Sequence, residues 1–313
     1  MPLLRFLPNV PNIDFIGARY YAFAVDGLLL LVSILSIAIH GFNLGIDFTG
    51  GVSLQVKSAQ TVNIGHVRGI IEGLHFNDEQ IQYFGGGQCD TPANSCVLVR
   101  VQPKANQTGE AAEAQIKGAL GKAYDFRAAQ VIGPKVSGEL FRSGVYATIL
   151  AIIAIAIWVA VRFEWQYGIS AAVCTGHDVL VTAGLFSVLH WDFTLTSIAA
   201  LLTLAGYSIN DTVVVFDRIR ENRRKYKRMP LAELINLSTN QMLSRTILTS
   251  VATAMSILPL LLFGGPSLFD FTAAILFGIV IGTASSTYVA SALLLYLPAP
   301  AGAIDTPAPA AGA

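Results

Sequence analysis

The chain has 313 residues, of which 53% are hydrophobic and only 13% are charged, and its mean hydropathy is +0.58. The charged fraction is about half that of an average soluble domain, which excludes a chain solvated by water over most of its surface. The formal net charge is zero, yet seven of the twenty Lys and Arg residues lie between Arg218 and Arg228. The composition therefore predicts a membrane protein with one local basic cluster.

Six apolar stretches are long enough to cross a bilayer, since each holds roughly the 17–25 apolar residues that a hydrocarbon core of ~30 Å requires. They are Tyr20–Ile39, Gly144–Val161, Gly168–Leu189, Leu195–Phe216, Thr246–Phe263 and Phe271–Leu297. The first stretch lacks a small-x-small cleavage site before Gly41, so we expect it to remain as an anchor. The pattern predicts a polytopic α-helical membrane protein, with one helix at residues 20–39 and a five-helix bundle at residues 144–297.

The short loops predict the orientation in the membrane. Arg218–Arg228 is strongly basic, whereas His190–Asp192 and Gly264–Pro266, on the other side, contain no Lys or Arg. Because basic loops stay in the cytoplasm, residues 217–245 are expected to form a cytoplasmic basic loop, with both termini on the same side. Within this loop, Pro230–Ser244 has the apolar spacing of an amphipathic helix lying along the membrane surface.

Residues 43–140, between the first two spans, have the composition of a soluble domain that faces the periplasm. The predicted strands are Val52–Val56, Gln80–Phe84, Cys96–Val101 and Phe126–Ile132, and the predicted helices are Thr61–Leu74 and Glu110–Tyr124. This βαββαβ order is that of a ferredoxin-like domain. We therefore expect an inserted α+β periplasmic domain between the first and second transmembrane helices.

The cysteines point to a disulfide and not to a metal site. Cys89 and Cys96 bracket a short loop between the two central strands, and in an oxidising periplasm their pairing would contribute about 2.5 kcal/mol on the chain-entropy model. Two unpaired thiols are the alternative. Two cysteines without nearby histidines provide too few ligands for zinc, and Cys174, inside a span, is expected to be a packing residue.

The ends of the chain carry no visible chemistry. Residues 1–19 are expected to form a cytoplasmic lead-in, and residues 298–313, rich in Ala and Pro, a disordered cytoplasmic tail. In the last span, Gly278, Gly282 and Ser286 recur at small-xxx-small spacing, which predicts close helix packing.

Asp211 is the first functional candidate, because it lies inside an apolar span. A carboxylate in the hydrocarbon costs roughly 2.5–3.5 kcal/mol on insertion scales and is tolerated mainly where it faces other helices, finds a partner or does chemistry. Arg245, in the next and antiparallel span, is expected at a comparable depth. If the two pair, the arginine holds Asp211 ionised, and its withdrawal favours the neutral acid. The alternative for Arg245 is snorkelling to the cytoplasmic headgroups.

Other polar groups lie near these two. Tyr207 and Asn210 are within about a turn of Asp211 and are candidates to hold water that feeds it. His177 and Asp178, in the middle of the third span, allow two interpretations, a proton relay or a satisfied hydrogen bond between helices. For Asp26, in the first span, we expect a carboxylate near the membrane surface or facing another helix.

Four motifs occur in order between the predicted spans. They are Leu44–Gly51, Val131–Gly138, Arg162–Trp165 and Gly206–Asn222. On these residues, and over about Ile13 to Leu297, the chain resembles the SecF family, the smaller partner in the bacterial SecD–SecF pair, within the resistance-nodulation-division superfamily.

The resemblance implies a non-enzymatic subunit of the Sec protein-export machinery in the bacterial inner membrane. Its implied partners are SecD, the SecYEG channel, YajC and preprotein substrates, and its energy source is the proton gradient, with no cofactor, metal or nucleic acid. The family's proton-relay aspartate falls on Asp211 and its arginine on Arg245. A further essential aspartate belongs to SecD, so the relay is expected to be completed only between subunits.

This resemblance leads to a mechanistic hypothesis. Protonation of Asp211 from the outside loosens its hold on Arg245, the spans shift, and a Gly-rich junction transmits the shift to the external domain. The residues of this junction are Gly45, Asp47, Gly50 and Gly51.

Two alternatives come from other functional classes. An intramembrane aspartyl protease would use Asp178 and Asp211 as a pair that shares a proton, but the sequence lacks a Gly-x-Gly-Asp site. A half-transporter of the same superfamily would export a small molecule or lipid, but the external domain shows no ligand-pocket signature.

Overall fold

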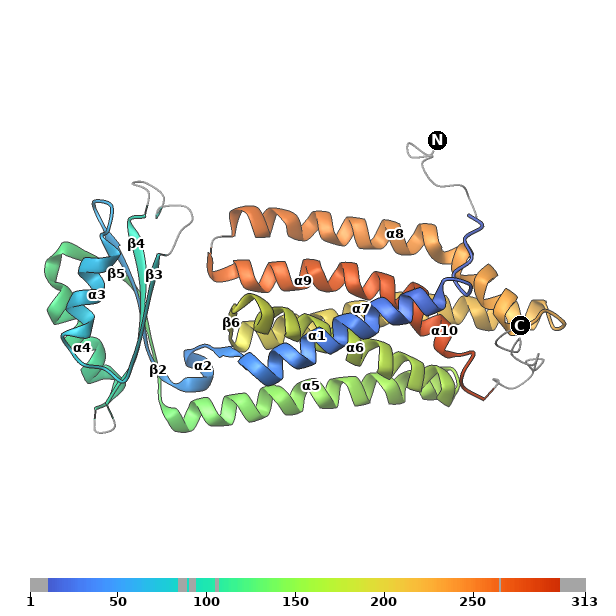
Figure 1. The fold of residues 1–313 in the computed structure, drawn as a ribbon, viewed down its shortest axis with the longest axis horizontal. Helices are drawn as coiled ribbons and strands as arrows, with labels where there is room; N and C mark the ends of the chain where they lie inside the picture. The colour runs from blue at the N-terminus through green and yellow to red at the C-terminus, as the bar shows by residue number, and fades with distance from the viewer. Residues whose placement is uncertain (1–10, 84–88, 90–93, 105–106, 265, 299–313) are drawn as a thin grey trace.

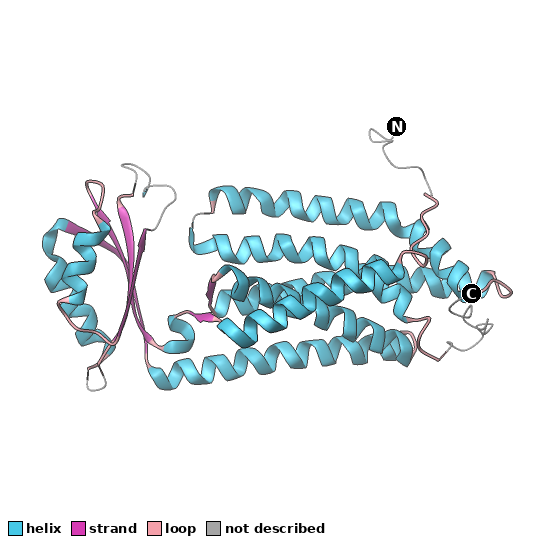
Figure 2. Ribbon diagram, in the orientation of Figure 1, coloured by secondary structure: helices cyan, strands magenta, loops and turns pink. Residues whose placement is uncertain are grey.

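The computed structural model describes residues 11–83, 89, 94–104, 107–264 and 266–298. These residues form a helical bundle with a small α/β domain at one end, and the described part of the chain begins and ends at the opposite end of the bundle (Figure 1). Most of the predicted lead-in and nearly all of the predicted disordered tail lie outside the described residues. Figure 2 shows how sharply the chain divides into a part that is almost wholly helical and a part built on strands.

Six described helices are long and apolar enough to cross a membrane. Five begin and end as α1 (Arg19–His40), α5 (Pro134–Arg162), α6 (Trp165–Leu189), α7 (Leu195–Lys225) and α8 (Leu231–Phe263), and the sixth is α9 (Pro266–Ser285) with the turns that follow it. The prediction of a polytopic helical membrane protein is confirmed.

The bundle is organised around α6 and α7. Within their most apolar windows, 56% and 50% of the residues are buried, against 6% in α1 and 11% in each of α5 and α8. The outer faces of α1, α5 and α8 expose large apolar side chains, as lipid-facing helices do. The two central helices are therefore where polar side chains can be enclosed by protein.

The second span begins earlier than the sequence suggested. The periplasmic segment was expected to continue to residue 140, but the last strand ends at Ile132 and α5 begins at Pro134. Pro134 occupies the first turn, where its fixed φ and missing N–H are compatible with a helix. The polar residues that resembled a loop thus form the outer turns of α5.

Helices occupy most of the predicted basic loop at residues 217–245. α7 continues to Lys225 and α8 begins at Leu231. The predicted surface helix at residues 230–244 is the first part of α8 and is continuous with its membrane-spanning part.

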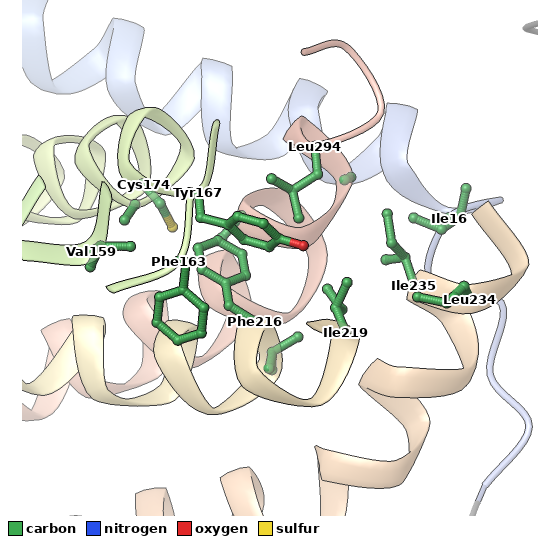
Figure 3. Packing of buried hydrophobic residues seen from close by; sticks show 14 residues of the cluster. Ile16, Val159, Phe163, Tyr167, Cys174, Phe216, Ile219, Leu234, Ile235 and Leu294 are labelled. Carbon is green, nitrogen blue, oxygen red and sulfur yellow. The ribbon is translucent and has the colours of Figure 1, made fainter. Parts of the chain in front are cut away.

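The physical reason for this extension is a hydrophobic cluster at the end of the bundle away from the α/β domain (Figure 3). Leu234 and Ile235 of α8 are buried there together with Phe216 and Ile219 of α7. The apolar face of this stretch therefore packs against protein, and the antiparallel pair of helices extends beyond the span instead of unwinding.

The last span ends in an irregular turn. After Ser285 the chain forms a π-helical turn, Ser286–Ala290, and then the short helix α10 (Ser291–Leu293). Gly278 and Gly282 of α9 face α7: a Cβ on Gly278 would lie 2.5 Å from the Leu204 side chain. The small residues thus allow a close contact between α9 and α7, which share a long interface.

The α/β domain has the element order β2 (Gly51–Ser58), α3 (Ile64–Glu72), β3 (Asp78–Tyr83), β4 (Cys96–Gln102), α4 (Gly109–Leu120), β5 (Tyr124–Ile132). Its four-stranded sheet has the order β3-β4-β2-β5, and every neighbouring pair is antiparallel. Both helices cover the face of the sheet that points away from the bundle (Figure 1). The core lies between helices and sheet, where Leu54, Val99 and Ile116 are fully buried.

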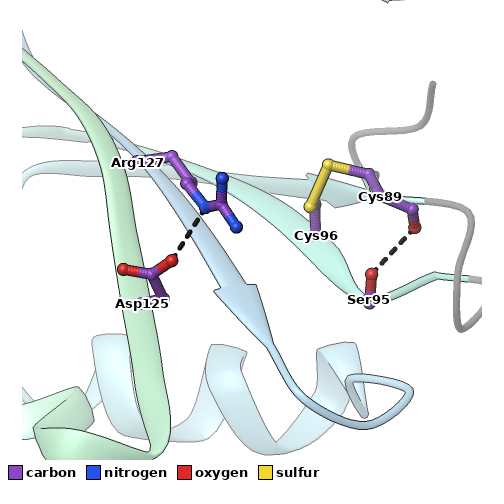
Figure 4. Close-up of a disulfide and its surroundings, with 5 residues drawn as sticks. All are labelled: Cys89, Ser95, Cys96, Asp125 and Arg127. Carbon is purple, nitrogen blue, oxygen red and sulfur yellow. Dashed lines mark hydrogen bonds and ion pairs between the residues drawn. A yellow bond between two sulfur atoms is a disulfide. The ribbon is translucent and has the colours of Figure 1, made fainter. Parts of the chain in front are cut away.

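Cys89 and Cys96 are joined by a disulfide, and the Ser95 hydroxyl donates to the Cys89 carbonyl oxygen at 2.9 Å beside it (Figure 4). The bond ties the loop that follows β3 to the first residue of β4. Cys174, the remaining cysteine, is buried in α6.

Replacing Cys96 with Ser is expected to lower the stability of the α/β domain by about 2.5 kcal/mol, because the unfolded chain regains the freedom of the closed loop. Hydrogen exchange of the β3 and β4 amides in the full chain measures this change. Cys174→Ser is the matched control and should leave those amides unchanged. Equal protection in Cys96→Ser and the parent protein would show that the disulfide adds no stability.

Candidate functional site

Asp211 of α7 is buried inside the bundle, with 2% of its surface exposed. Its Oδ2 atom accepts a long hydrogen bond of 3.5 Å from the Ser250 hydroxyl of α8, and the Thr249 hydroxyl also interacts with it. Ser250 has three shorter bonds, at 2.8 Å to the Thr246 carbonyl oxygen, at 2.7 Å with Thr283 Oγ1 of α9 and at 3.0 Å from the Tyr207 hydroxyl. Asp211 therefore lies at the edge of a network of hydroxyl groups that hold one another more closely than they hold the carboxyl group.

Arg245 lies on α8, near Asp211 but not paired with it. Ser250 contacts Asp211, and Arg245 precedes Ser250 by five residues, so Arg245 lies about one and a half helical turns, ~7.5 Å, nearer the end of the bundle away from the α/β domain. Arg245 is exposed and lines a cavity of about 500 Å³ between α5, α7 and α8. The ion pairs of the described residues do not include one between Arg245 and Asp211.

Tyr207 and Asn210, the other residues of α7 proposed to support Asp211, lie on different sides of the helix. The Tyr207 hydroxyl donates to Ser250 Oγ at 3.0 Å and belongs to the same network. Asn210 is exposed on the outer surface of α7 at mid-span. The structure thus brings Tyr207 to the site and leaves Asn210 outside it.

Asp178 and His177 of α6 form a separate polar cluster. Asp178 is fully buried and accepts hydrogen bonds from Ser208 Oγ of α7 at 2.5 Å and from Ser285 Oγ of α9 at 2.9 Å. The two carboxyl groups have different partners, and no hydrogen bond between Asp178 and Asp211 occurs among the described residues. This arrangement does not form the shared-proton carboxyl pair that an aspartyl protease requires.

The Gly-rich junction ties the external domain to the start of α7. The Gly45 N–H donates to the Phe193 carbonyl oxygen at 2.8 Å, and the Asp47 carboxylate accepts from the backbone N–H of Leu195, the first residue of α7, at 2.9 Å. A carboxylate at this position also interacts favourably with the positive end of the helix dipole. Asp47 is therefore a helix cap supplied by the junction.

Two short strands reinforce this connection. β1 (Asn43–Leu44) pairs in parallel with β6 (Asp192–Phe193), which lies in the turn between α6 and α7, and the short helix α2 (Ile46–Thr49) follows β1. Gly45 has no room for a side chain, since a Cβ would lie 2.7 Å from the Thr194 methyl group. These strands were not predicted, because two-residue strands have no periodicity.

Gly50 and Gly51 allow the chain to enter the sheet. Their φ angles are 75° and 135°, in the region that favours glycine. A Cβ on Gly51 would lie 2.6 Å from the Val101 carbonyl oxygen, so only glycine permits β2 to start beside β4.

An ion pair joins the external domain to the bundle at the same place. Arg100 Nη1 of β4 lies 2.5 Å from Asp192 Oδ2 of β6, and the side chains are only 18% and 19% exposed. The other Asp192 oxygen accepts from the Asn43 amide at 2.9 Å. We name the Arg100–Asp192 pair, the Asp47 cap and the β1–β6 pairing together the domain–bundle contact.

Two family models match the chain. Residues 112–299 match the family described as protein export membrane protein SecD/SecF, C-terminal, and residues 35–62 match the SecD/SecF GG motif, which includes Gly50 and Gly51. The chain belongs to the SecD/SecF family. The first match alone covers more than half of the chain and contains both Asp211 and Arg245.

Curated relatives agree. The chain is 42% identical to the protein translocase subunit SecF of Cereibacter sphaeroides, over 94% of this chain and 92% of the relative. It is 38% identical to SecF of Escherichia coli O157:H7, over 91% of this chain and 87% of the relative. The chain is thus a Sec protein-export subunit, a transport component. The alternative of a small-molecule half-transporter is not favoured.

Two solved structures are similar. The chain superposes on SecDF, a translocon-associated membrane protein from Thermus thermophilus, with a TM-score of 0.80 at 36% identity, over 93% of this chain. On SecDF in its super-membrane-facing form the TM-score is 0.68, also at 36% identity, over 94% of this chain. In both cases this chain covers 39% of the SecDF chain.

Replacing Arg100 with Gln is expected to loosen the domain–bundle contact. A hydrogen bond to a charged group contributes ~1.5–3 kcal/mol, so amide exchange at residues 43–45 and 192–195 should accelerate by about tenfold or more. The charge-exchanged variant Arg100→Asp with Asp192→Arg should recover part of the protection. Lys117→Gln, which removes a surface pair within α4, is the control. Unchanged exchange in Arg100→Gln would show that the pair does not hold the domain.

Proposed function

We propose that this chain couples proton flow to late preprotein translocation and to release on the periplasmic side, with Asp211 as the group that binds and releases the proton. The observation that carries the proposal is the environment of Asp211, a buried carboxyl group inside a membrane span with a hydrogen bond as long as 3.5 Å. A carboxylate held so loosely in this position is costly, and its protonation removes the cost.

The hydroxyl groups around Asp211 suit both of its protonation states. A hydroxyl donates to a carboxylate, and it accepts a hydrogen bond from a carboxylic acid after rotation about its C–O bond. Ser250 and Thr249 therefore provide partners for the charged and for the neutral form without a change of helix positions. The site can take up a proton before any larger movement begins.

Arg245 provides the bias between the two states. A cation that approaches a carboxylate favours its ionised form, and a cation that withdraws favours the acid. In the structure Arg245 forms no ion pair with Asp211 and lines a cavity about one and a half helical turns away. We infer that this arrangement corresponds to the protonated half of the cycle. Each charge that crosses the full membrane potential supplies ~2.3 kcal/mol per 100 mV.

The domain–bundle contact is the proposed route from Asp211 to the external domain. α7 carries Asp211 in its middle and begins at Leu195, whose backbone N–H is bonded to Asp47. A shift of α7 therefore moves the junction, and Arg100 transfers the movement to the centre of the sheet. The junction residues Gly45, Gly50 and Gly51 are where the chain can bend.

We also propose SecD as the partner of this chain. The similar SecDF chains are more than twice as long as this one, which covers 39% of them, and the unmatched part would here be a separate SecD subunit. Asn210, exposed at mid-span, is better covered by another helix than by lipid, since an unsatisfied polar group in hydrocarbon is costly. SecYEG and YajC remain proposed partners on the family resemblance.

The orientation and domain type belong to the same proposal. Lys and Arg residues concentrate at the end of the bundle away from the α/β domain. On this ground we propose that this end and both termini lie in the cytoplasm and the α/β domain in the periplasm of a bacterial inner membrane. The antiparallel order β3-β4-β2-β5, with both helices on one face, supports a ferredoxin-like domain.

The test is proton-gradient-dependent preprotein release in inverted vesicles that contain this chain and its SecD. Asp211→Asn and Arg245→Met are each expected to reduce the gradient-dependent part at least tenfold while the complex still assembles, because the first variant cannot ionise and the second removes the cation. Asp217→Asn, the same change at an exposed position of α7, should retain it. Full gradient dependence in both site variants would contradict the proposal.

A further inference from the structure

The side chains of His177 and Asp178 form a polar cluster whose hydrogen bonds reach three other helices. It lies where α1, α6, α7 and α9 meet, and each ring nitrogen of His177 faces an oxygen atom. His177 Nδ1 lies 3.0 Å from Asp178 Oδ1, and Nε2 lies 3.2 Å from the main-chain carbonyl oxygen of Asp26 in α1. Each of these two contacts needs one hydrogen atom between the nitrogen and the oxygen.

The contact with Asp26 fixes one proton. A carbonyl oxygen only accepts hydrogen bonds, so Nε2 of His177 must carry a hydrogen. In a neutral imidazole Nδ1 then has a lone pair, and that lone pair points at Asp178 Oδ1. If Asp178 were an ordinary carboxylate, two lone pairs would face each other at 3.0 Å.

A second proton between His177 and Asp178 removes this conflict. It can lie on Nδ1, giving an imidazolium beside a carboxylate, or on Oδ1, giving a carboxylic acid beside a neutral imidazole. Both forms have a net charge of zero. The hydroxyls of Ser208 and Ser285 both donate to the other carboxyl oxygen of Asp178, Oδ2. The shared proton therefore lies between Asp178 Oδ1 and His177 Nδ1.

We propose that His177 and Asp178 form a second proton-holding site, distinct from Asp211, in which one proton is shared across the 3.0 Å contact. A neutral pair is the form that a membrane interior favours, because an uncompensated charge there is costly. The titratable groups facing the pair are the Asp26 carboxyl group of α1, which interacts electrostatically with both residues, and the Cys174 thiol of α6. From α7 the nearest is Asp211, one turn beyond Ser208, while the facing residues of α9 provide hydroxyls.

The shared proton also maintains the contact between α7 and α9. A Cβ on Gly282 of α9 would lie 3.3 Å from Ser208 Cβ and 3.4 Å from Asp178 Oδ2, so the helices are in tight contact there. The next residue, Thr283, bonds to Ser250, which faces Asp211. The same stretch of α9 thus contacts both proton sites, and the neutral pair fixes α9 while Asp211 changes its charge.

The proton count does not depend on proton flow through Asp211 and is tested by thermal unfolding of the complex at different pH values. Above about pH 7 the unfolded chain holds a proton on neither residue, since ordinary pKa values are ~3.9 for Asp and ~6.5 for His. The folded chain retains one. Unfolding at this pH therefore releases a proton, and stability from this site is fully present between about pH 4 and about pH 6.5 and falls as the pH rises above that range.

Asp178→Asn is the informative variant, because its amide can donate to Nδ1 and its carbonyl oxygen can accept from both serines without an extra proton. The pH slope of its stability between about pH 7 and about pH 9 should be smaller by one proton per molecule than that of the parent. Asp217→Asn, at an exposed position, should keep the parent slope. Equal slopes in the parent and Asp178→Asn would overturn the proposal.

A second measurement uses the parent protein and no variant. In the parent complex with ¹⁵N-labelled histidine, the His177 ring signals should show a hydrogen-bonded Nδ1 and a protonated Nε2 that do not change between about pH 5.5 and about pH 8. Titration of this ring near its ordinary pKa of ~6.5 would overturn the proposal, because a shared proton is not exchanged in that range.

Discussion

A carboxyl group inside a bilayer must be enclosed by protein and given partners, and this requirement shapes the whole bundle. The two central helices, α6 and α7, carry Asp178 and Asp211, and both side chains point inward. Hydroxyl-bearing residues of α8 and α9 meet them, while α1 and α5 cover the outside with apolar side chains. Close approach of α9 to α7 depends on Gly278 and Gly282.

The two carboxyl groups meet this requirement in different ways, and the difference suggests different roles. Asp178 is held by two serines and a histidine at 2.5–3.0 Å, which suits a group that keeps one arrangement. Asp211 has a longer bond of 3.5 Å to a serine whose shorter bonds go elsewhere. Asp211 is loosely held and, among the described residues, forms no ion pair with Arg245, so it is suited to change its charge. Asp178 is tightly held and is suited to keep the helices in place meanwhile.

The sequence was sufficient for features with a local signal. Six apolar stretches predicted a multi-pass membrane protein, which the structure confirms, and Asp211 was conspicuous because a charge interrupts an apolar run. Arg100 and Asp192 had no such signal, since they are distant in the sequence and meet only after the sheet docks on the bundle. The ends of α7 and α8 away from the α/β domain were predicted as a loop with a separate surface helix, because the sequence does not show that Ile219 and Leu234 are buried in one cluster. Contacts between distant segments thus account for most of what the sequence did not reveal.

The central claim is that the charge on Asp211 sets the position of the external domain through α7 and the domain–bundle contact. The most direct measurement is the distance between spin labels at the exposed residues Gln82 and Ser256, followed against pH in the complex with SecD. The account predicts that the distribution of label-to-label distances changes with pH in the parent chain. In Asp211→Asn the distribution should keep the form that the parent has at low pH. The same pH response in both proteins would contradict it.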